Sequence, residues 1–339
     1  MHWSKAQTKG DIAFEGIRSH TATVVGHKIY VFGGSDIQDR FNDLLILDTS
    51  SRVYVNHSFI HSFIHSSIHS FIYFLETMFW HKPKTTGAEG CIPNPHRAHS
   101  STLVDHRLFI FGGGDGPNYF KDLYILDTNT LTWTKPTTLG NGPGPRRAHT
   151  ANLIGKLIYI FGGGDGNKAL NEVYVLDTET LTWTYIKTTG AIPGSRGYHS
   201  SVLLSNGRIG IFGGSDGNDC FSDFYVFDTN NSSWSLFPVS NPSPLLSQSC
   251  VTIGKTIVVF GGHNANDYIN SLKFFNLDKF QWEEQTCSGI LPLSRGYHCC
   301  CFVDHRLFVI GGYDGSQCFS DVQILDLGVL SYLELHQNK

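Results

Sequence analysis

The sequence predicts an all-β protein built from six copies of one unit. Each unit contains an apolar run, rich in β-branched and aromatic residues, that ends at a Gly-Gly pair. Gly, Asp and Asn residues separate these runs, and this punctuation favours strands over helices. The pattern returns about every 50 residues, which indicates a repeat architecture.

Several positions keep a constant distance from the Gly-Gly pairs. The pairs are Gly33 and Gly34, Gly112 and Gly113, Gly162 and Gly163, Gly213 and Gly214, Gly261 and Gly262, and Gly311 and Gly312. An Asp or Asn follows the first glycine by fifteen residues. In all units except the first, an aromatic residue follows it by twenty-one residues, at Trp133, Trp183, Trp234, Trp282 and Tyr332. A histidine precedes the pair in five units, and Gln248 stands in its place in the remaining one.

Six in-phase copies of an apolar run, Gly-Gly, Asp and Trp resemble the kelch repeat. The resemblance covers nearly the whole chain outside one insertion. It implies a six-bladed β-propeller of four-stranded antiparallel blades around a central channel. We expect one domain over residues 1–339, because single blades cannot bury their faces alone. The blades are expected to begin near Arg18, Arg97, Arg147, Arg196, Ser247 and Arg295.

The closure of the ring has two solutions in the sequence. Seven residues mark outer strands, from Trp3 to Tyr332, whereas six blades need six. Either residues 1–9 form a single N-terminal strand that completes the last blade, or the C-terminal segment Leu-Ser-Tyr-Leu-Glu-Leu completes it. We favour Trp3, because tryptophan buries more apolar area than tyrosine. Joining the two ends in one sheet removes exposed strand edges.

An insertion at residues 51–74 lengthens the first unit, in which Trp80 marks the outer strand. It repeats His-Ser-Phe-Ile between His57 and Ile72. A CATT nucleotide repeat translates into this motif, so we interpret the segment as a retained intron or gene-model error. The alternative is metal binding, because four histidines at intervals of four residues would share one helix face.

The glycine pairs and the tryptophans are expected to be structural. Inner strands converge near the channel, where a backbone without Cβ can approach its neighbours closely. The outer-strand residues Trp80, Trp133, Trp183, Trp234 and Trp282 are expected to pack between blades. The Asp and Asn residues that end the third strands are expected to accept backbone hydrogen bonds in turns.

Candidate partner-binding residues lie in the linkers and in the loops between the second and third strands, which open on one face. The linker arginines are Arg97, Arg147, Arg196 and Arg295, and Arg18 stands at a similar offset. We favour a structural role for them, although guanidiniums on one face could bind carboxylates. Residues that vary between copies are better partner candidates, and they are Asn118, Tyr119, Asn167, Tyr198, Asn218, Asn264, Tyr297 and Tyr313.

Composition argues against several classes of partner. The net charge of −4 gives no electrostatic footprint for nucleic acid. No apolar segment long enough to span a membrane is visible, and the N-terminus does not resemble a signal peptide. The eight cysteines are therefore expected to be reduced thiols in a cytoplasmic, monomeric protein. We expect no metal or cofactor.

The kelch resemblance implies a non-catalytic scaffold or adaptor that binds a protein partner. The alternative is a metal-dependent propeller enzyme, such as one similar to galactose oxidase, whose copper is held by tyrosine and histidine ligands. Tyr198 and Tyr297 each precede a histidine, but those histidines belong to the repeat itself. We also see no carboxylate pair or nucleophile–base arrangement beyond what repetition produces.

Overall fold

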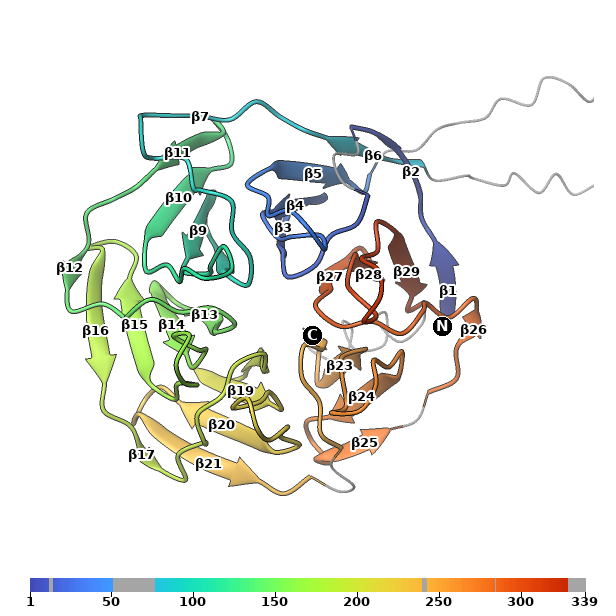
Figure 1. Ribbon diagram of the computed structural model, residues 1–339. Helices are drawn as coiled ribbons and strands as arrows, with labels where there is room; N and C mark the ends of the chain where they lie inside the picture. Colours follow the sequence, from blue (N-terminus) through green and yellow to red (C-terminus); the bar gives the residue numbers. More distant parts are fainter. Residues whose placement is uncertain (12–14, 51–76, 240–242, 284, 329–339) are drawn as a thin grey trace, which may run out of the picture.

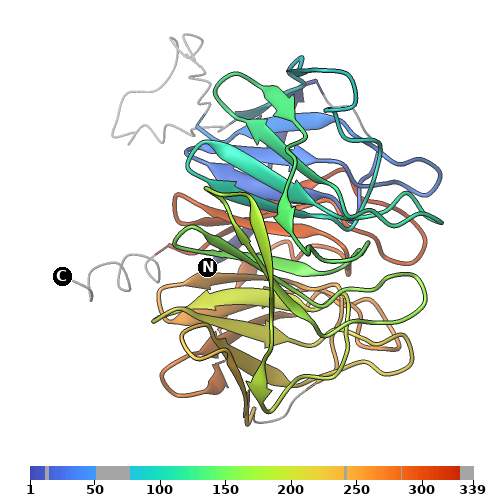
Figure 2. The ribbon, with the colours of Figure 1, turned by 90° about the vertical axis from the view of Figure 1, so that its left-hand side faces the viewer.

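The computed structural model describes residues 1–11, 15–50, 77–239, 243–283 and 285–328. These residues form six sheets arranged as blades in a ring, each with a core of four antiparallel strands, and none of the residues is helical. Figure 1 looks along the ring axis, and Figure 2 shows the loops of the two faces from the side. The six-bladed all-β propeller is thus confirmed. The insertion at residues 51–74 and Tyr332 lie outside the described residues.

Each blade runs outward from the channel through four strands. The innermost strands are β3 (Thr21–Val25), β8 (Ser100–Val104), β13 (Thr150–Ile154), β18 (Ser200–Leu204), β22 (Ser249–Ile253) and β27 (Cys299–Val303). The second strands are β4 (Lys28–Phe32), β9 (Arg107–Phe111), β14 (Leu157–Phe161), β19 (Arg208–Phe212), β23 (Thr256–Phe260) and β28 (Arg306–Ile310). The third strands are β5 (Leu44–Asp48), β10 (Leu123–Asp127), β15 (Val173–Asp177), β20 (Phe224–Asp228), β24 (Leu272–Asn276) and β29 (Val322–Asp326). The outer strands are β6 (Thr77–His81), β11 (Thr132–Thr134), β16 (Thr182–Ile186), β21 (Ser233–Phe237), β25 (Gln281–Glu283) and, for the last blade, β1 (His2–Lys5).

Five blades carry a short fifth strand that the sequence did not predict. These strands are β2 (Gln7–Gly10), β7 (Thr86–Gly87), β12 (Leu139–Gly140), β17 (Thr189–Gly190) and β26 (Ser288–Gly289). Each pairs in parallel with the outer strand of its blade. Gly140 shows why glycine ends such a strand: its φ is +74°, and a Cβ there would lie 2.2 Å from the Trp183 carbonyl oxygen. Only a residue without a side chain fits this approach.

The N-terminal segment joins the last blade to the first. β1 pairs antiparallel with β29, and Trp3 lies opposite Leu325. The next strand, β2, crosses to blade 1 and pairs with β6. The expectation that residues 1–9 form a single outer strand is therefore wrong. These residues are shared between two blades (Figure 1). The alternative closing segment, Leu-Ser-Tyr-Leu-Glu-Leu, lies outside the described residues.

Aromatic pairs fill the interfaces between blades. In five of the six blades, the phenylalanine that precedes the Gly-Gly pair packs against the outer-strand tryptophan of the next blade, and in the last blade Ile310 takes its place. Phe111 and Trp183 have ring centroids 5.1 Å apart, and Phe32 and Trp133 are 4.9 Å apart. The same phenylalanine meets the next blade's histidine edge-on, as in Phe111 and His149 at 5.4 Å. Each interface thus buries large apolar side chains from both blades.

The repeated histidines are buried framework residues. Nε2 of His149 lies 2.9 Å from the Ser100 hydroxyl of the preceding blade, and Nε2 of His199 lies 2.9 Å from the Thr150 hydroxyl. Burial lowers the pKa of His149 and His199 to about 3, so both are neutral at physiological pH. Gln248 takes the equivalent place in blade 5 and donates from Nε2 to the Phe212 carbonyl at 3.0 Å.

A closed ring of six backbone hydrogen bonds surrounds the channel. The residue before each histidine, or before Gln248, donates its N–H to its counterpart in the preceding blade, at 2.8–3.0 Å. The ring members are Ser19, Ala98, Ala148, Tyr198, Ser247 and Tyr297. All six have positive φ, between 53° and 58°. This left-handed conformation is the same in every blade, so the ring repeats one local geometry six times.

Candidate functional site

The linker arginines fall into two sets that occupy different places. Arg146, Arg196 and Arg295 lie three residues before the repeat histidine, and at most 1% of each is exposed. Arg196 donates to the Gly213 carbonyl at 3.0 Å and to Asp223 Oδ2 at 3.0 Å. Arg295 makes the equivalent bonds to Gly311 and Asp321, at 2.9 and 3.1 Å. Arg196 and Arg295 therefore hold the framework together, and the idea that they are accessible to a partner is wrong.

The second set lies two residues before the histidine and borders the channel. It consists of Arg18, Arg97 and Arg147, on three successive blades. Their backbones pair with the residue after each Gly-Gly pair, as in the bridge between Arg147 and Gly164. Linker and loop therefore meet on one face, as the sequence predicted. We use the name channel mouth for this face around the channel. It consists of the linker residues just before each repeat histidine or Gln248 and of the loops that follow the Gly-Gly pairs.

These three arginines lack carboxylate partners. In the described part of the chain, no ion pair involves Arg18, Arg97 or Arg147, and all three are half-buried. Burial lowers the pKa of Arg97, and repulsion from Arg18 and Arg147 lowers it further. The mouth thus holds three arginines in blades 1–3 without an ion-pair partner in the described ranges, while Asp36, Asp115 and Asp165 in the neighbouring loops accept backbone N–H bonds of their own loops.

Aromatic rings hold two of these guanidiniums in place. Arg18 lies over the Tyr313 ring, 4.1 Å from its centroid, and Arg147 lies over the Tyr119 ring at 4.7 Å. Stacking fixes the plane of a guanidinium and leaves its N–H edge available for hydrogen bonds. Tyr119 and Tyr313 therefore act as supports for the arginines.

Tyr198 and Tyr297 form the opposite side of the mouth. Both are members of the hydrogen-bonded ring, with φ of 56° and 58°. Bulky residues rarely adopt this conformation, and serine or alanine occupies the ring in the other blades. The two rings meet at right angles, with centroids 5.5 Å apart. The framework does not require tyrosine here, so these side chains are the strongest candidates for a binding role.

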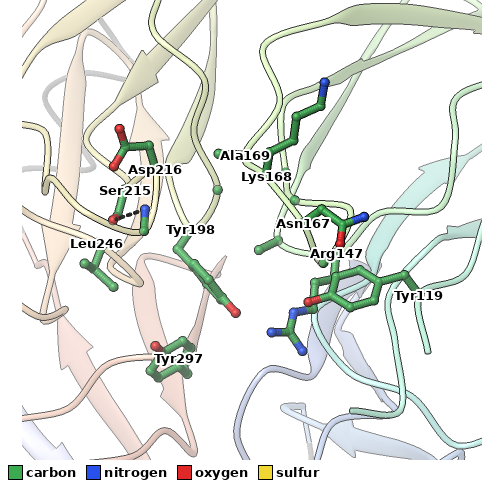
Figure 3. Close-up of a pocket in the computed structure, with 16 residues that line it drawn as sticks. Tyr119, Arg147, Asn167, Lys168, Ala169, Tyr198, Ser215, Asp216, Leu246 and Tyr297 are labelled. Atoms are coloured by element: carbon green, nitrogen blue, oxygen red, sulfur yellow. Dashed lines mark hydrogen bonds between the residues drawn. The ribbon is translucent and has the colours of Figure 1, made fainter. Parts of the chain in front are cut away.

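A cavity of about 330 Å³ opens between the two sides of the mouth. Arg147, Tyr119, Tyr198, Tyr297 and Leu246 contribute to its lining. In Figure 3, Arg147 and Tyr119 lie on one side of the cavity, facing Tyr198 and Tyr297 on the other. This is the size at which proteins begin to enclose small ligands or side chains.

The candidate asparagines are divided between turns and surface. Asn118 donates from Nδ2 to Asp115 Oδ2 at 3.0 Å, and Asn264 accepts backbone N–H bonds from Asn266 and Asp267. Both side chains are therefore used by their own loops. Asn167 lines the cavity, whereas Asn218 is exposed and does not belong to its lining.

Tyr268 is a mouth residue that was not among the candidates. Its ring lies 5.7 Å from that of Tyr313 and 6.4 Å from that of Tyr297. Burial raises the pKa of Tyr268 and of Tyr297, so both hydroxyls keep their protons. The position was available in the sequence, because Tyr268 follows Gly262 at the interval that separates Tyr119 from Gly113.

Metal ligation has no assembled site in the described residues. No group of three His, Cys, Asp or Glu side chains is placed there to hold an ion. The histidines that follow Tyr198 and Tyr297 are buried, in the positions that belong to the repeat. In the same part of the chain, no helix is long and apolar enough to cross a membrane.

Comparison with known proteins places this geometry in a family. The model of the KLHDC2/KLHL20/DRC7 Kelch-repeats domain matches residues 60–262 and 240–339, and the Kelch motif matches residues 17–55. Kelch domain-containing protein 3 of Rattus norvegicus is 31% identical over 317 residues, which cover 87% of this chain and 77% of that protein. Kelch domain-containing protein 2 of Bos taurus is 36% identical over 94 residues, or 26% of this chain and 23% of that protein.

Another relative matches this chain over part of its own length. Acyl-CoA-binding domain-containing protein 4 of Arabidopsis thaliana is 27% identical over 258 residues, which cover 75% of this chain. The match spans only 32% of that relative's own length. The repeat spacing, the six-bladed ring and the family match over more than half of the sequence agree, and the chain belongs to the kelch-repeat family.

Proposed function

We propose that this kelch propeller is a protein-interaction module that binds an acidic segment of a partner at the channel mouth. The observation that carries the proposal is the set Arg18, Arg97 and Arg147. These three half-buried guanidiniums lie on adjacent blades, and none has a carboxylate partner among the described residues. The contrast with Arg196 and Arg295, which are paired within the framework, makes this lack of partners a specific feature.

An acidic ligand would offset the repulsion between the three arginines of the mouth. Partial burial and mutual repulsion both disfavour the charged form of Arg97, as its lowered pKa indicates. A carboxylate that accepts two parallel N–H bonds from a guanidinium supplies the missing opposite charge. Nucleic acid fits less well, because the protein carries a net charge of −4 and the arginines lie within the mouth rather than along an open stripe.

The proposal extends to an adaptor role in a reducing compartment such as the cytoplasm. All eight cysteines are unpaired, as expected where thiols are kept reduced. No specific observation favours catalysis, so we propose that the chain acts by holding its partner rather than by transforming it.

The test is selection of short random peptides displayed on phage. One bait is the wild-type chain, and another carries Arg97→Glu and Arg147→Glu. A matched control carries Lys187→Glu on an outer edge and Arg208→Glu at the end of a second strand on the opposite face. Circular dichroism and thermal unfolding establish that all three baits are folded.

We expect peptides selected by the wild type and the control to be enriched in Asp and Glu. Individual peptides should bind the Arg97→Glu/Arg147→Glu protein at least about tenfold more weakly, because a charge-assisted hydrogen bond contributes roughly 1.5–3 kcal/mol. Selection of peptides without acidic enrichment would refute the proposal. Equal binding of acidic peptides by the folded charge-reversed bait would refute it as well.

A further inference from the structure

The channel mouth is chemically divided between two halves of the ring. In blades 1–3, the position two residues before the histidine is arginine, and the ring position beside it is serine or alanine. In blades 4–6 the first position is Gly197, Leu246 or Gly296, and the ring position is tyrosine in two of the three. Each blade thus projects one large side chain at most from this pair of positions. Cationic side chains gather in one half and aromatic side chains in the other.

The aromatic half is a continuous surface. Tyr198 contacts Tyr297, whose centroid lies 6.4 Å from that of Tyr268, and Tyr268 lies 5.7 Å from Tyr313. Tyr313 in turn supports Arg18 at 4.1 Å, so the two halves meet at the junction of blades 6 and 1. Tyr198 and Tyr297 keep an unfavourable backbone conformation that serine adopts elsewhere in the ring, which points to a function for their rings.

The cavity of about 330 Å³ spans the second junction, between blades 3 and 4. Arg147 and Lys168 contribute to its lining from blade 3, whereas Tyr198 and Leu246 contribute from blades 4 and 5. A ligand in this cavity therefore touches both halves at once. Figure 3 shows the Arg147 guanidinium and the Tyr198 ring facing each other across the space.

We propose that the mouth recognises a two-part determinant, in which an anionic group meets Arg147 and an aromatic group packs against Tyr198 and Tyr297. This inference rests on the proposed function and specifies its ligand. An acidic residue would be bound toward blade 3, and a neighbouring aromatic residue would lie over blades 4–6. Because the two halves are not interchangeable, the partner segment is held in one direction. An acidic segment without an aromatic neighbour would leave the tyrosine surface uncovered.

Small probes test the two parts separately. The probe 3-phenylpropionate carries both groups, propionate carries only the anion, and 3-phenylpropionamide carries only the ring. Binding of each probe to the full chain is measured by ligand-observed NMR titration up to about 10 mM.

The protein variants are Arg147→Gln, Tyr198→Ser and Tyr297→Ser. Serine is the residue of the ring in blades 1 and 5, at φ of 53° and 56°, so the fold should tolerate it. Tyr185→Ser, an outer-strand residue that is 55% exposed, is the matched control.

We expect 3-phenylpropionate to bind roughly three- to tenfold more tightly than either single-group probe. Arg147→Gln should abolish its advantage over the amide, and either mouth tyrosine variant should abolish its advantage over propionate. Tyr185→Ser should change neither the affinity ratio of 3-phenylpropionate to the amide nor its ratio to propionate.

If propionate binds through Arg147 but the phenyl group adds nothing, the two-part determinant is refuted and the acidic-segment proposal survives. If 3-phenylpropionate does not bind, or if Arg147→Gln has no effect on either anionic probe, the two-part determinant is likewise refuted, and peptide selection decides the proposed function independently.

Discussion

The backbone N–H of Ser19 donates to the carbonyl oxygen of Tyr297, 2.8 Å away, and links the first blade to the last. Five equivalent bonds continue around the channel. The chain thus closes twice, at the channel through Ser19 and at the outer edge through Trp3, which lies opposite Leu325. Stability should therefore depend on the interfaces between blades as much as on the sheets themselves.

The first prediction concerns the packing between blades. Trp183→Ala should lower the free energy of unfolding by about 3–5 kcal/mol, because it removes a large buried ring that contacts Phe111. Tyr185→Ala, two residues along the same strand, should cost far less because Tyr185 is 55% exposed. Urea unfolding of the two variants measures the difference. Thermal unfolding of Trp183→Ala at the wild-type temperature would show that the tryptophan is not part of the packing.

The second prediction separates framework arginines from those of the mouth. Arg196→Ala should destabilise the fold by about 3 kcal/mol or more, because it leaves Asp223 and the Gly213 carbonyl without their buried partner. Arg147→Ala should cost much less, since its guanidinium makes no ion pair in the described chain. Chemical denaturation checks both values. The double variant Arg196→Ala/Asp223→Ala should be less destabilised than the sum of the single changes, and strict additivity would contradict the pairing.

The third prediction is a pH dependence that the buried histidines cause. Burial lowers the pKa of His149 to about 3 in the folded state, against about 6.5 when the chain is unfolded. Between these values the unfolded state binds more protons, so stability is full above pH 6.5 and is lost as the pH falls. Each such histidine should contribute a slope of about 1.4 kcal/mol per pH unit.

His149→Gln isolates one of these contributions. Glutamine occupies the equivalent site in blade 5, so the substitution has a precedent within this fold. The variant should lose less stability than the wild type between pH 6.5 and pH 5, where carboxylates contribute little. Urea titrations at the two pH values measure this difference. Equal slopes for both proteins would mean that His149 titrates normally in the folded state.

Much of the architecture could be predicted because repetition multiplies weak local signals. One Gly-Gly pair says little, but six pairs in register with Asp and Trp indicate the blades and their order. The expected turn role of Asp177 is confirmed, since it accepts N–H bonds from Glu179 and Thr180 at 2.9 and 3.0 Å. The parallel fifth strands were missed because two-residue pairings such as Thr189–Gly190 have no hydrophobic pattern of their own.

The candidate site was harder to predict because a shift of one residue changes the side of the backbone from which a side chain emerges. Arg146 and Arg147 are adjacent, yet the first is 1% exposed and ion-paired while the second borders the channel. Grouping Arg147 with Arg196 therefore mixed two structural positions. The two positions differ in their distance from the repeat histidine: Arg196 lies three residues before His199, whereas Arg147 lies two residues before His149. Alignment of the units on the histidine would have separated them. The repeat placed Tyr198, Tyr297 and Tyr313 on one face, but the contacts that join them through Tyr268 depend on the three-dimensional ring and have no signal in the sequence.

The ring of backbone hydrogen bonds also gives the six blade junctions the same backbone geometry at the channel. At the channel, the junction between the last blade and the first has the same backbone donor, the same backbone acceptor and the same left-handed conformation as the other five junctions. The backbone around the channel therefore does not distinguish the first blade from the others. The position of the N-terminus is thus marked only at the outer edge of the ring, where β1 and β2 pair with β29 and β6.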